Sequence, residues 1–502
     1  MSLTRIIRPF FSRRYAQICR YDRHAEEIQR GVLRRLVRAG AATAFGQRFG
    51  FGKIETYERF SVTVPLSDYE ALKADIDRMR HGSGDLLWPG RTRWFAQSSG
   101  TTSDRSKFIP VTQQSLADTH YRGGADAVTL YLHHHPESRL FDGRALILGG
   151  SHAPNFNLPH SLVGDLSAIL IENINPLVNL VRTPSKNTAL LADFEQKRDR
   201  IAREALTKNV TSLSGVPSWM MSVLQRVLEL SGKSTISEVW PRLEVFFHGG
   251  VSFTPYRQQY RSLLPHEGMH YMETYNASEG FFGLQDDPAE ASLLLMLDYG
   301  VFYEFIPLDE LGNSDPTVLP VWEVEAGRNY AMVITTSSGL WRYLIGDTVR
   351  FTSVQPYKFV ITGRTKSFIN AFGEELIVDN AERGLAEACR ATGASVKEYT
   401  AAPVFMNARG ECRHQWVVEF DRRPADTEAF AEALDKALQR LNSDYEAKRY
   451  KNLTLQRLEL VTARSGLFDD WLRSRGKLGG QHKVPRLANT RDIIEQILAL
   501  NA

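Results

Sequence analysis

Short apolar runs that end in glycine or proline recur along the chain, and they constrain its fold more than any other feature. The runs are rich in β-branched or aromatic residues, which is typical of buried strands. They read RALILGG, LEVFFHGG, MHYMETY, SLLLMLDYG, VFYEFIPL and NYAMVITT. Helical patterns lie between several of them, as in SWMMSVLQRVLEL, where apolar residues recur at helical spacing. Strands interleaved with helices predict an α/β architecture with mixed sheets.

The length of the chain, 502 residues, is too great for one ordinary core, so we expect more than one domain. The strongest boundary signal is the segment TGRTKSFINAFGEELIVDNAE, residues 362–382. We therefore predict a large N-terminal domain over residues 1–362, with mixed β-sheets flanked by helices. A small mobile α+β domain is predicted over residues 363–502, a normal domain size. Its predicted elements are a helix over 379–390, strands near 396–404 and 415–420, a long helix with Phe430, Leu434, Leu438, Leu441 and Tyr445 on one stripe, and a strand in LTLQRLELV.

The composition excludes several classes of protein. A hydrophobic fraction of 43% and a charged fraction of 24% are those of a soluble globular chain. The net charge of +3 gives no electrostatic case for binding nucleic acid, and no run approaches the roughly 18 apolar residues of a membrane span. Cys19, Cys389 and Cys412 lie far apart, which predicts free thiols in a reducing compartment. We expect a cytoplasmic monomer.

The first 23 residues are rich in arginine and contain no acidic residue before Asp22. Such a composition fits a transit peptide. It equally fits a basic amphipathic helix that rests on the domain, because the pattern continues without a break into the helical EEIQRGVLRRLVRAG. The sequence favours the second interpretation and leaves the first open.

A loop rich in hydroxyl side chains, SSGTTSDRSKFIPVT, covers residues 98–112. Gly100 lets the backbone approach an anion closely, and successive N–H groups in such a loop form a positive nest. Hydroxyl donors and one lysine surround it: Ser98, Ser99, Thr101, Thr102 and Lys107. The loop either holds the phosphates of ATP or is a surface turn. It is not a Walker A motif, because the second glycine is missing and Phe108 stands where that motif has Ser or Thr.

Other catalytic motifs fail on their local context. The segment HEGMH, residues 266–270, matches the zinc-protease pattern, which needs both histidines on one helical face. Pro265, Gly268 and the strand-like residues that follow predict a turn instead. No complete dinucleotide fingerprint and no G-x-S-x-G elbow occur in the chain.

Three further segments carry residues that suit a nucleotide. In YNASEG, Ser278 and Glu279 follow a predicted strand, where a hydroxyl and a carboxylate could meet phosphate and magnesium. In RYLIGD, Asp347 could pair with two ribose hydroxyls. In GGQHKVPR, Lys483 lies in a glycine-rich loop. Each also has a plainer interpretation, as a surface acid, a turn aspartate or a solvated basic loop.

Taken in order, these motifs resemble the nucleotide-binding motifs of the Gretchen Hagen family, the acyl acid amido synthetases that conjugate plant hormones to amino acids. That family belongs to the adenylate-forming superfamily of luciferases and acyl-CoA synthetases. Lys107 lies seven positions after Gly100, as in the amido synthetases and one position later than in the wider superfamily. The segments YEFIP and HKVPR strengthen the match. The residues of GGQHKVPR and RYLIGD differ from the plant pattern, which favours a microbial member.

The resemblance implies a role for each matching residue. Phosphate contacts are implied for Ser98, Ser99, Gly100, Thr101, Thr102 and Lys107, and further ATP contacts for Gly249, Gly250, Tyr275, Ser278 and Asp347. Glu279 would hold Mg²⁺, and Asp347 would bind the ribose. In the C-terminal part, Arg364 and the pivot Lys366 would lie at the hinge, and Lys483 would meet the reacting carboxylate and the α-phosphate. Leu344 departs from the plant pattern, which often has arginine there, so the missing phosphate contact is either supplied by Arg342 or absent.

The expected function is therefore that of an ATP-dependent acyl acid amido synthetase that uses Mg²⁺. It would adenylate a carboxylic acid, of which an aryl or indolyl acid such as auxin is one candidate, and transfer the acyl group to an amino acid. Two alternatives remain: an acyl-CoA synthetase with the same first step, and a nucleotide-binding protein without turnover. Tyr121, Trp219 and Phe281 are either acid-pocket residues or ordinary core aromatics.

Overall fold

A computed structural model describes residues 2–98, 107–250, 253, 256–311, 313–365, 368–374, 376–405, 412–449, 455–474 and 484–501. The chain divides into two compact units, which we call the large unit and the small unit. The large unit comprises Met1–Ser98, Lys107–Phe253 and Tyr260–Gly363. The small unit comprises Ser99–Ser106, Thr254–Gln259 and Arg364–Ala502.

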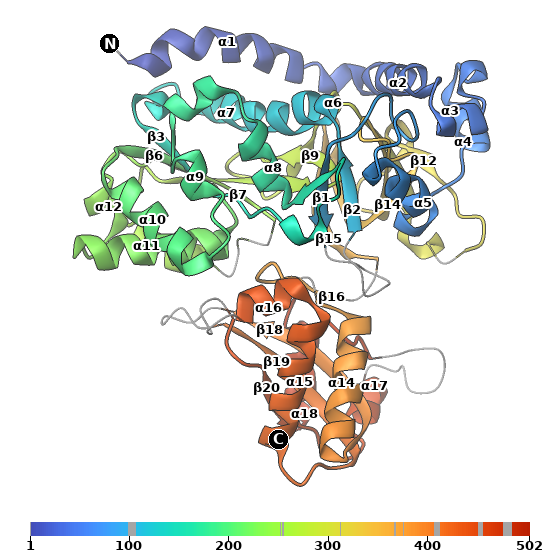
Figure 1. Cartoon of the computed structure of the whole chain (residues 1–502), viewed down its shortest axis with the longest axis vertical. Coiled ribbons are helices and arrows are strands. Elements are labelled where there is room, and N and C mark those ends of the chain that lie inside the picture. The colour runs from blue at the N-terminus through green and yellow to red at the C-terminus, as the bar shows by residue number, and fades with distance from the viewer. Residues whose placement is uncertain are drawn as a thin grey trace. The chain divides into compact units, whose positions relative to one another are not determined.

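A twelve-stranded mixed sheet forms the centre of the large unit (Figure 1). Its strand order is β12-β11-β13-β14-β15-β10-β9-β8-β7-β6-β3-β5. The five strands from β5 to β8 run parallel, and from the β8–β9 pair onward the sheet becomes antiparallel. The strands are β3 (Arg144–Ile147), β5 (Arg182–Thr183), β6 (Val210–Gly215), β7 (Val245–Gly249), β8 (His270–Ala277), β9 (Gly280–Leu284), β10 (Leu293–Leu295), β11 (Val301–Pro307), β12 (Leu319–Pro320), β13 (Asn329–Thr336), β14 (Tyr343–Val354) and β15 (Tyr357–Arg364).

The six apolar runs singled out in the sequence form β3, β7, β8, β10, β11 and β13, so the strand predictions are confirmed. Every residue of β11 is buried, which explains why this strand reads as an almost continuous apolar run. A separate three-stranded sheet, in the order β2-β1-β4, also belongs to the large unit. Its strands are β1 (Trp94–Ser98), β2 (Lys107–Val111) and β4 (Leu162–Gly164).

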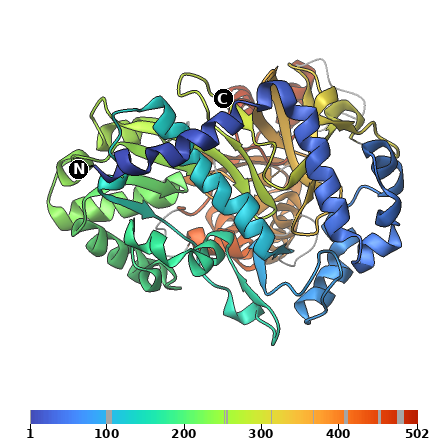
Figure 2. The same cartoon turned by 90° about the horizontal axis from the view of Figure 1, so that it is seen from above.

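Helices cover the sheets of the large unit. α7 packs against β8 and β9, and α1 lies along α7 on the outside of the unit (Figures 1 and 2). The arginine-rich N-terminal segment thus forms a helix, α1, that rests on the large unit. This agrees with the basic helix that the sequence favoured over a transit peptide. The helices are α1 (Leu3–Ile18), α2 (Tyr21–Gly40), α3 (Ala44–Arg48), α4 (Tyr57–Thr63), α5 (Tyr69–Arg80), α6 (Gln113–Ser115), α7 (Arg122–His134), α8 (Leu166–Asn173), α9 (Lys186–Ala189), α10 (Phe194–Leu206), α11 (Pro217–Ser231), α12 (Ile236–Val239) and α13 (Arg257–Leu263).

The small unit is an α+β structure with its own apolar core. That core includes Val417, Leu467, Trp471 and Ile497. A three-stranded sheet, β18-β19-β20, carries helices α14 and α15, which pack against each other. The elements are β16 (Phe368–Ile369), β17 (Leu376–Ile377), α14 (Val378–Thr392), β18 (Ser395–Val404), β19 (Arg413–Arg422), α15 (Thr427–Leu441), α16 (Ser443–Arg449), β20 (Glu459–Thr462), α17 (Leu467–Ser474) and α18 (Asp492–Leu500).

Two predictions for the small unit need correction. The apolar stripe from Phe430 to Tyr445 does not lie on one helix, because α15 ends at Leu441 and Asn442 adopts an extended conformation. The Asn442 side chain then accepts a hydrogen bond from the backbone N–H of Tyr445, which caps the start of α16. Among the described residues of LTLQRLELV, the strand is β20, which begins only at Glu459 and ends one residue past this segment, at Thr462. Across the described chain, no helix is both long and apolar enough to span a membrane.

Candidate active site

Three parallel strands of the large sheet end beside one another. β6 ends at Gly215, β7 at Gly249 and β8 at Ala277, and β7 pairs with both neighbours. Because the strands are parallel, their carboxyl ends share one edge of the sheet, which is where open α/β sheets bind ligands. Ser278 and Glu279 form the two-residue turn between β8 and β9 at this edge, and Glu279 is buried. Gly249 and the Ser278–Glu279 turn thus lie toward the same edge of the sheet, and β8 extends three residues beyond Thr274, the partner of Gly249.

Gly249 and Gly250 continue this edge, and each position needs a glycine. A Cβ atom on Gly249 would lie 2.3 Å from the carbonyl oxygen of Thr274 on β8. Gly250 has a φ of +83°, in the left-handed region that favours glycine. A Cβ there would lie 3.4 Å from the side chain of Val216, which follows β6. The two glycines thus form a stretch of backbone without side chains that packs closely against β8 at this edge.

Tyr275 and Asp347 join two motifs that lie far apart in the sequence. The Tyr275 hydroxyl on β8 donates a short hydrogen bond to the carboxylate of Asp347 on β14. Both residues are buried, with exposed fractions of 7% and 5%. The Tyr275 ring packs against Phe282 and Phe359, at centroid distances of 5.1 and 5.9 Å. These two rings, which the sequence interpretation missed, hold the phenol in place, and nothing in their local pattern distinguishes them from core residues.

The loop between β1 and β2 is anchored by a strand pair. Ser98 lies opposite Lys107 in the antiparallel register of β1 and β2, so the two residues flank the mouth of this hairpin. The Lys107 ammonium lies 5.9 Å from the centroid of the Tyr69 ring, a cation–π contact with α5. Ser99, Gly100, Thr101 and Thr102 lie outside the described residues.

The remaining predicted residues belong to the small unit or its border. Arg364 is the last residue of β15, and the division between the two units falls between Gly363 and Arg364. Lys366 and Lys483 lie outside the described residues. Their roles stay predictions.

Arg342 is engaged by other residues of the large unit, so of the two alternatives left open by the sequence the structure does not support a phosphate contact from Arg342. Its guanidinium bonds to both carboxylate oxygens of Glu304 on β11, with Nη2 2.9 Å from Oε1. It also donates to the backbone carbonyls of Ser61 and Val64 at the end of α4. Both charged side chains are almost completely buried. Arg342 therefore caps a helix and neutralises a buried carboxylate, and Leu344 packs against a small apolar cluster.

The aromatic candidates for an acid pocket have structural contacts of their own. Phe281 on β9 is buried edge-on against Tyr299, at 5.9 Å, and a Cβ on Gly123 of α7 would lie 2.4 Å from the Phe281 ring. The Tyr121 hydroxyl donates to the carbonyl of Leu170. The Trp219 ring lies 5.6 Å from the ammonium of Lys197. Phe281 is thus a core residue, whereas Tyr121 is only half-buried.

The segment HEGMH forms a turn that leads into β8, so the predicted turn is confirmed. His270 is the first residue of the strand and lies ring to ring with His135, at a centroid distance of 3.8 Å. The helical face that a zinc protease needs does not form there. Within the described ranges, no three His, Cys, Asp or Glu residues gather in a metal-binding arrangement.

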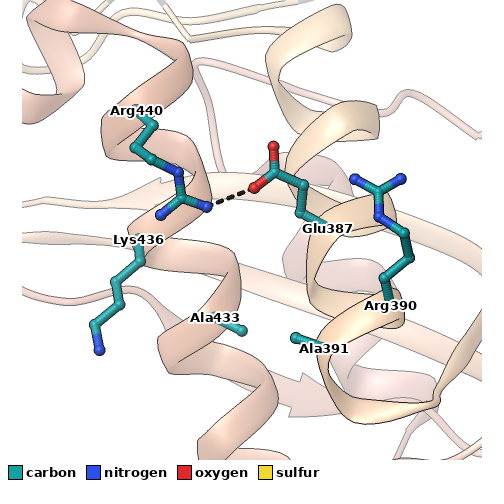
Figure 3. Close-up of a pocket in the computed structure, with 6 residues that line it drawn as sticks. All are labelled: Glu387, Arg390, Ala391, Ala433, Lys436 and Arg440. Carbon is teal, nitrogen blue, oxygen red and sulfur yellow. Dashed lines mark hydrogen bonds and ion pairs between the residues drawn. The ribbon is translucent and has the colours of Figure 1, made fainter.

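A hollow on the small unit lies between α14 and α15 and is unrelated to the predicted motifs (Figure 3). Its lining residues are Glu387, Arg390, Ala391, Ala433, Lys436 and Arg440. Arg440 is paired with Glu387 across the hollow, and Lys436 is paired with Glu432. Because most of its charges are neutralised, the hollow is a poor anion site.

His120 gives the large unit a specific acid sensitivity. It lies in the π-helical segment Leu116–Tyr121 that leads into α7, and it is 5% exposed. Burial lowers the pKa of His120 from 6.5 to about 4. The unfolded chain binds this proton below pH 6.5 and the folded protein does not, so stability falls as the pH decreases from 6.5 towards 4. At pH 5 the lost stability is about 2 kcal/mol relative to pH 7.5.

We expect His120→Gln to remove this contribution. The measurement is the free energy of unfolding in urea at pH 5 and pH 7.5 for the wild type and the variant. His135 and His270, whose pKa values are also lowered by burial, remain in both proteins and cancel in the comparison. Equal pH dependence in the two proteins would show that His120 does not resist protonation.

A mixed sheet in the large unit and a separate α+β unit match the architecture expected of an adenylate-forming enzyme. The family models that match are the GH3 family N-terminal domain over residues 14–269, the central domain over 294–364 and the C-terminal domain over 379–492. The chain belongs to the GH3 family, which confirms the resemblance seen in the sequence.

Its relatives include plant amido synthetases. The chain is 23% identical to indole-3-acetic acid-amido synthetase GH3.3 of Arabidopsis thaliana, over 94% of this chain and 91% of that protein. It is 24% identical to jasmonoyl-L-amino acid synthetase GH3.5 of Oryza sativa subsp. japonica, over 95% of each. Two solved structures share the fold. A GH3.15 acyl acid amido synthetase in complex with 2,4-DB has a TM-score of 0.62 at 17% identity, covering 97% of this chain and 95% of that one. A 2-hydroxyisobutyryl-CoA ligase has a TM-score of 0.52 at 15% identity, covering 94% and 91%.

Proposed function

We propose that this protein is an ATP-dependent acyl acid amido synthetase, a ligase that forms a C–N bond through an acyl adenylate. The proposed substrates are a carboxylic acid, with aryl and indolyl acids as first candidates, and an amino acid. The observation that carries the proposal is the hydrogen bond between Tyr275 and Asp347. This hydrogen bond links two of the proposed nucleotide motifs, YNASEG and RYLIGD. The relatives of this chain named above are amido synthetases.

The residues of the large unit suit the parts of a nucleotide. The Asp347 carboxylate can accept hydrogen bonds from two ribose hydroxyls while Tyr275 orients it. Gly249 and Gly250 offer a backbone surface thin enough for a planar base. Lys107 and the loop it ends would counter the charge of the phosphates.

Magnesium fits the turn at the end of β8. Glu279 supplies a hard carboxylate oxygen and Ser278 a hydroxyl at the same edge of the sheet, and these are ligand types that Mg²⁺ prefers. Bound there, the ion would neutralise phosphate charge. The other groups of the site orient the substrates.

The proposed chemistry needs no covalent enzyme intermediate. A carboxylate oxygen attacks the α-phosphorus of ATP, which forms the acyl adenylate and expels pyrophosphate. The amine then attacks the acyl carbon, loses its proton and releases AMP. Positioning and electrostatic stabilisation supply the catalysis. We propose that Lys483 neutralises charge on the reacting groups and that Arg364 and Lys366 act at a hinge between the two steps.

The identity of the acyl acceptor, an amine or a thiol, distinguishes the proposed amido synthetase from an acyl-CoA synthetase. A CoA synthetase shares the adenylation step, and the fold resemblance to a CoA ligase does not exclude it. A nucleotide-binding protein without turnover is the second alternative.

The proposed enzyme acts as a monomer in the cytoplasm.

We expect the purified protein to form AMP from ATP and Mg²⁺ only when a suitable acid is present, and to form an amide when amino acids are added. The assay separates AMP from ADP and detects amides by mass, using panels of aryl and indolyl acids with pooled amino acids. Lys483→Ala is expected to lower the rate by 100-fold or more, because a charge that meets the transition state is lost. Turnover that requires coenzyme A would support the thiol acceptor, and ADP formation would overturn the adenylation mechanism.

A further inference from the structure

The outer side of α1 combines exposed apolar residues with arginine. Leu3, Ile6 and Phe10 are 42%, 53% and 74% exposed, and their spacing places them along one stripe of the helix. Arg13 is exposed next to this stripe, Arg5 is exposed further around the helix, and Arg20 is exposed just beyond its end. A large exposed Phe next to an Ile and a Leu is unusual for a face that meets only water.

The inner side of the same helix is held firmly to the large unit. The guanidinium of Arg14 bridges Asp126 of α7 and Asp298, with an N–O distance of 2.7 Å to each. Arg8 donates to the backbone carbonyls of Leu132 and His135 at the end of α7. The structure therefore uses these two arginines internally, and the outer stripe is presented on a helix that is already folded and fixed.

The outward arginines are not neutralised by acids. Within the described residues, Arg5, Arg13 and Arg20 form no ion pair, and the helix carries no acidic side chain. α2 continues along the same side of the unit (Figures 1 and 2), and its exposed Arg34, Arg35 and Arg38 also lack an ion pair with any described residue. The acids at the start of α2 are paired locally, as Glu26 is with Arg30.

We infer that the outer face of α1 binds an anionic lipid surface, with Leu3, Ile6 and Phe10 entering the headgroup boundary and the arginines contacting lipid phosphates. A helix that lies in the plane of a membrane needs this pairing of an apolar stripe with basic residues. Charge complementarity selects anionic lipid, because the exposed arginines of α1 and α2 named above form no ion pair with a described residue. The association is peripheral, reversible and weakened by salt.

Sedimentation of the full-length protein with vesicles tests this inference. Vesicles of equal parts phosphatidylcholine and phosphatidylglycerol are expected to bind the protein, and pure phosphatidylcholine vesicles are expected to bind it far less. Ile6→Ser with Phe10→Ser should lower the partition coefficient by about tenfold or more. Arg5→Gln with Arg13→Gln should lower it by about 25-fold, at about fivefold for each arginine.

Matched control variants keep the test specific. Val62→Ser with Leu177→Ser removes two apolar side chains that lie elsewhere and are 77% and 70% exposed. Lys233→Gln with Arg423→Gln removes two exposed charges elsewhere. Both controls should bind vesicles like the wild type, and all variants should keep the wild-type melting temperature. Equal binding by the α1 variants and the controls would overturn the inference. So would a dimer in sedimentation velocity that only the α1 substitutions dissociate, because the face would then bind a second copy.

Discussion

Replacing Asp347 with alanine is expected to lower kcat/KM for ATP by about 100-fold to 1000-fold in the acid-dependent formation of AMP. The carboxylate is proposed to accept hydrogen bonds from two ribose hydroxyls, and each charged hydrogen bond is worth about 1.5–3 kcal/mol. Losing both, each at about 1.5–2 kcal/mol in the lower part of this range, costs about 3–4 kcal/mol of transition-state stabilisation. The measurement is steady-state AMP formation at a saturating concentration of acid and amino acid.

Tyr275→Phe is the matched control for this experiment. It keeps the carboxylate and the packing of the ring against Phe282 and Phe359, and it removes only the hydrogen bond to Asp347. We expect a loss of about tenfold, because the carboxylate remains but is less well oriented. An Asp347→Ala enzyme that folds normally and keeps the wild-type kcat/KM for ATP would contradict the proposed ribose contact.

Replacing Glu304 with alanine is expected to lower the free energy of unfolding by about 3–5 kcal/mol. Glu304 lies on the fully buried strand β11, and burial raises its pKa while the Arg342 charge opposes this shift. Removing the carboxylate leaves the Arg342 guanidinium buried with only two backbone carbonyls as partners, which is the costly case for a buried charge. Urea-induced unfolding followed by tryptophan fluorescence measures the change.

Two further variants isolate the cost of the unpaired charge. The double substitution Glu304→Met with Arg342→Met should recover much of the lost stability, because no charge is left buried. Arg328→Ala, which breaks an exposed pair with Asp309, should cost less than about 1 kcal/mol. A Glu304→Ala protein as stable as Arg328→Ala would show that the buried pair contributes little.

Strands could be predicted from the sequence wherever burial leaves a local pattern. VFYEFIP and NYAMVITT are apolar because β11 and β13 are buried along their length, so the pattern reports the burial directly. The end of α15 could not be predicted in the same way. The apolar stripe continues through Tyr445, while the break at Asn442 depends on one residue's backbone conformation and its side-chain hydrogen bond.

The sequence by itself determined the order and spacing of the nucleotide motifs, and with them the family, because backbone loops at a binding edge need particular residue types at fixed local positions. Only the tertiary structure showed that Tyr275 meets Asp347, 72 positions later, and that Arg342 serves Glu304 instead of a phosphate. It alone showed which arginines of α1 are paired internally and which face outward. Such contacts depend on strand order and helix packing. The local sequence around a residue does not indicate which distant residue it will contact in the folded protein.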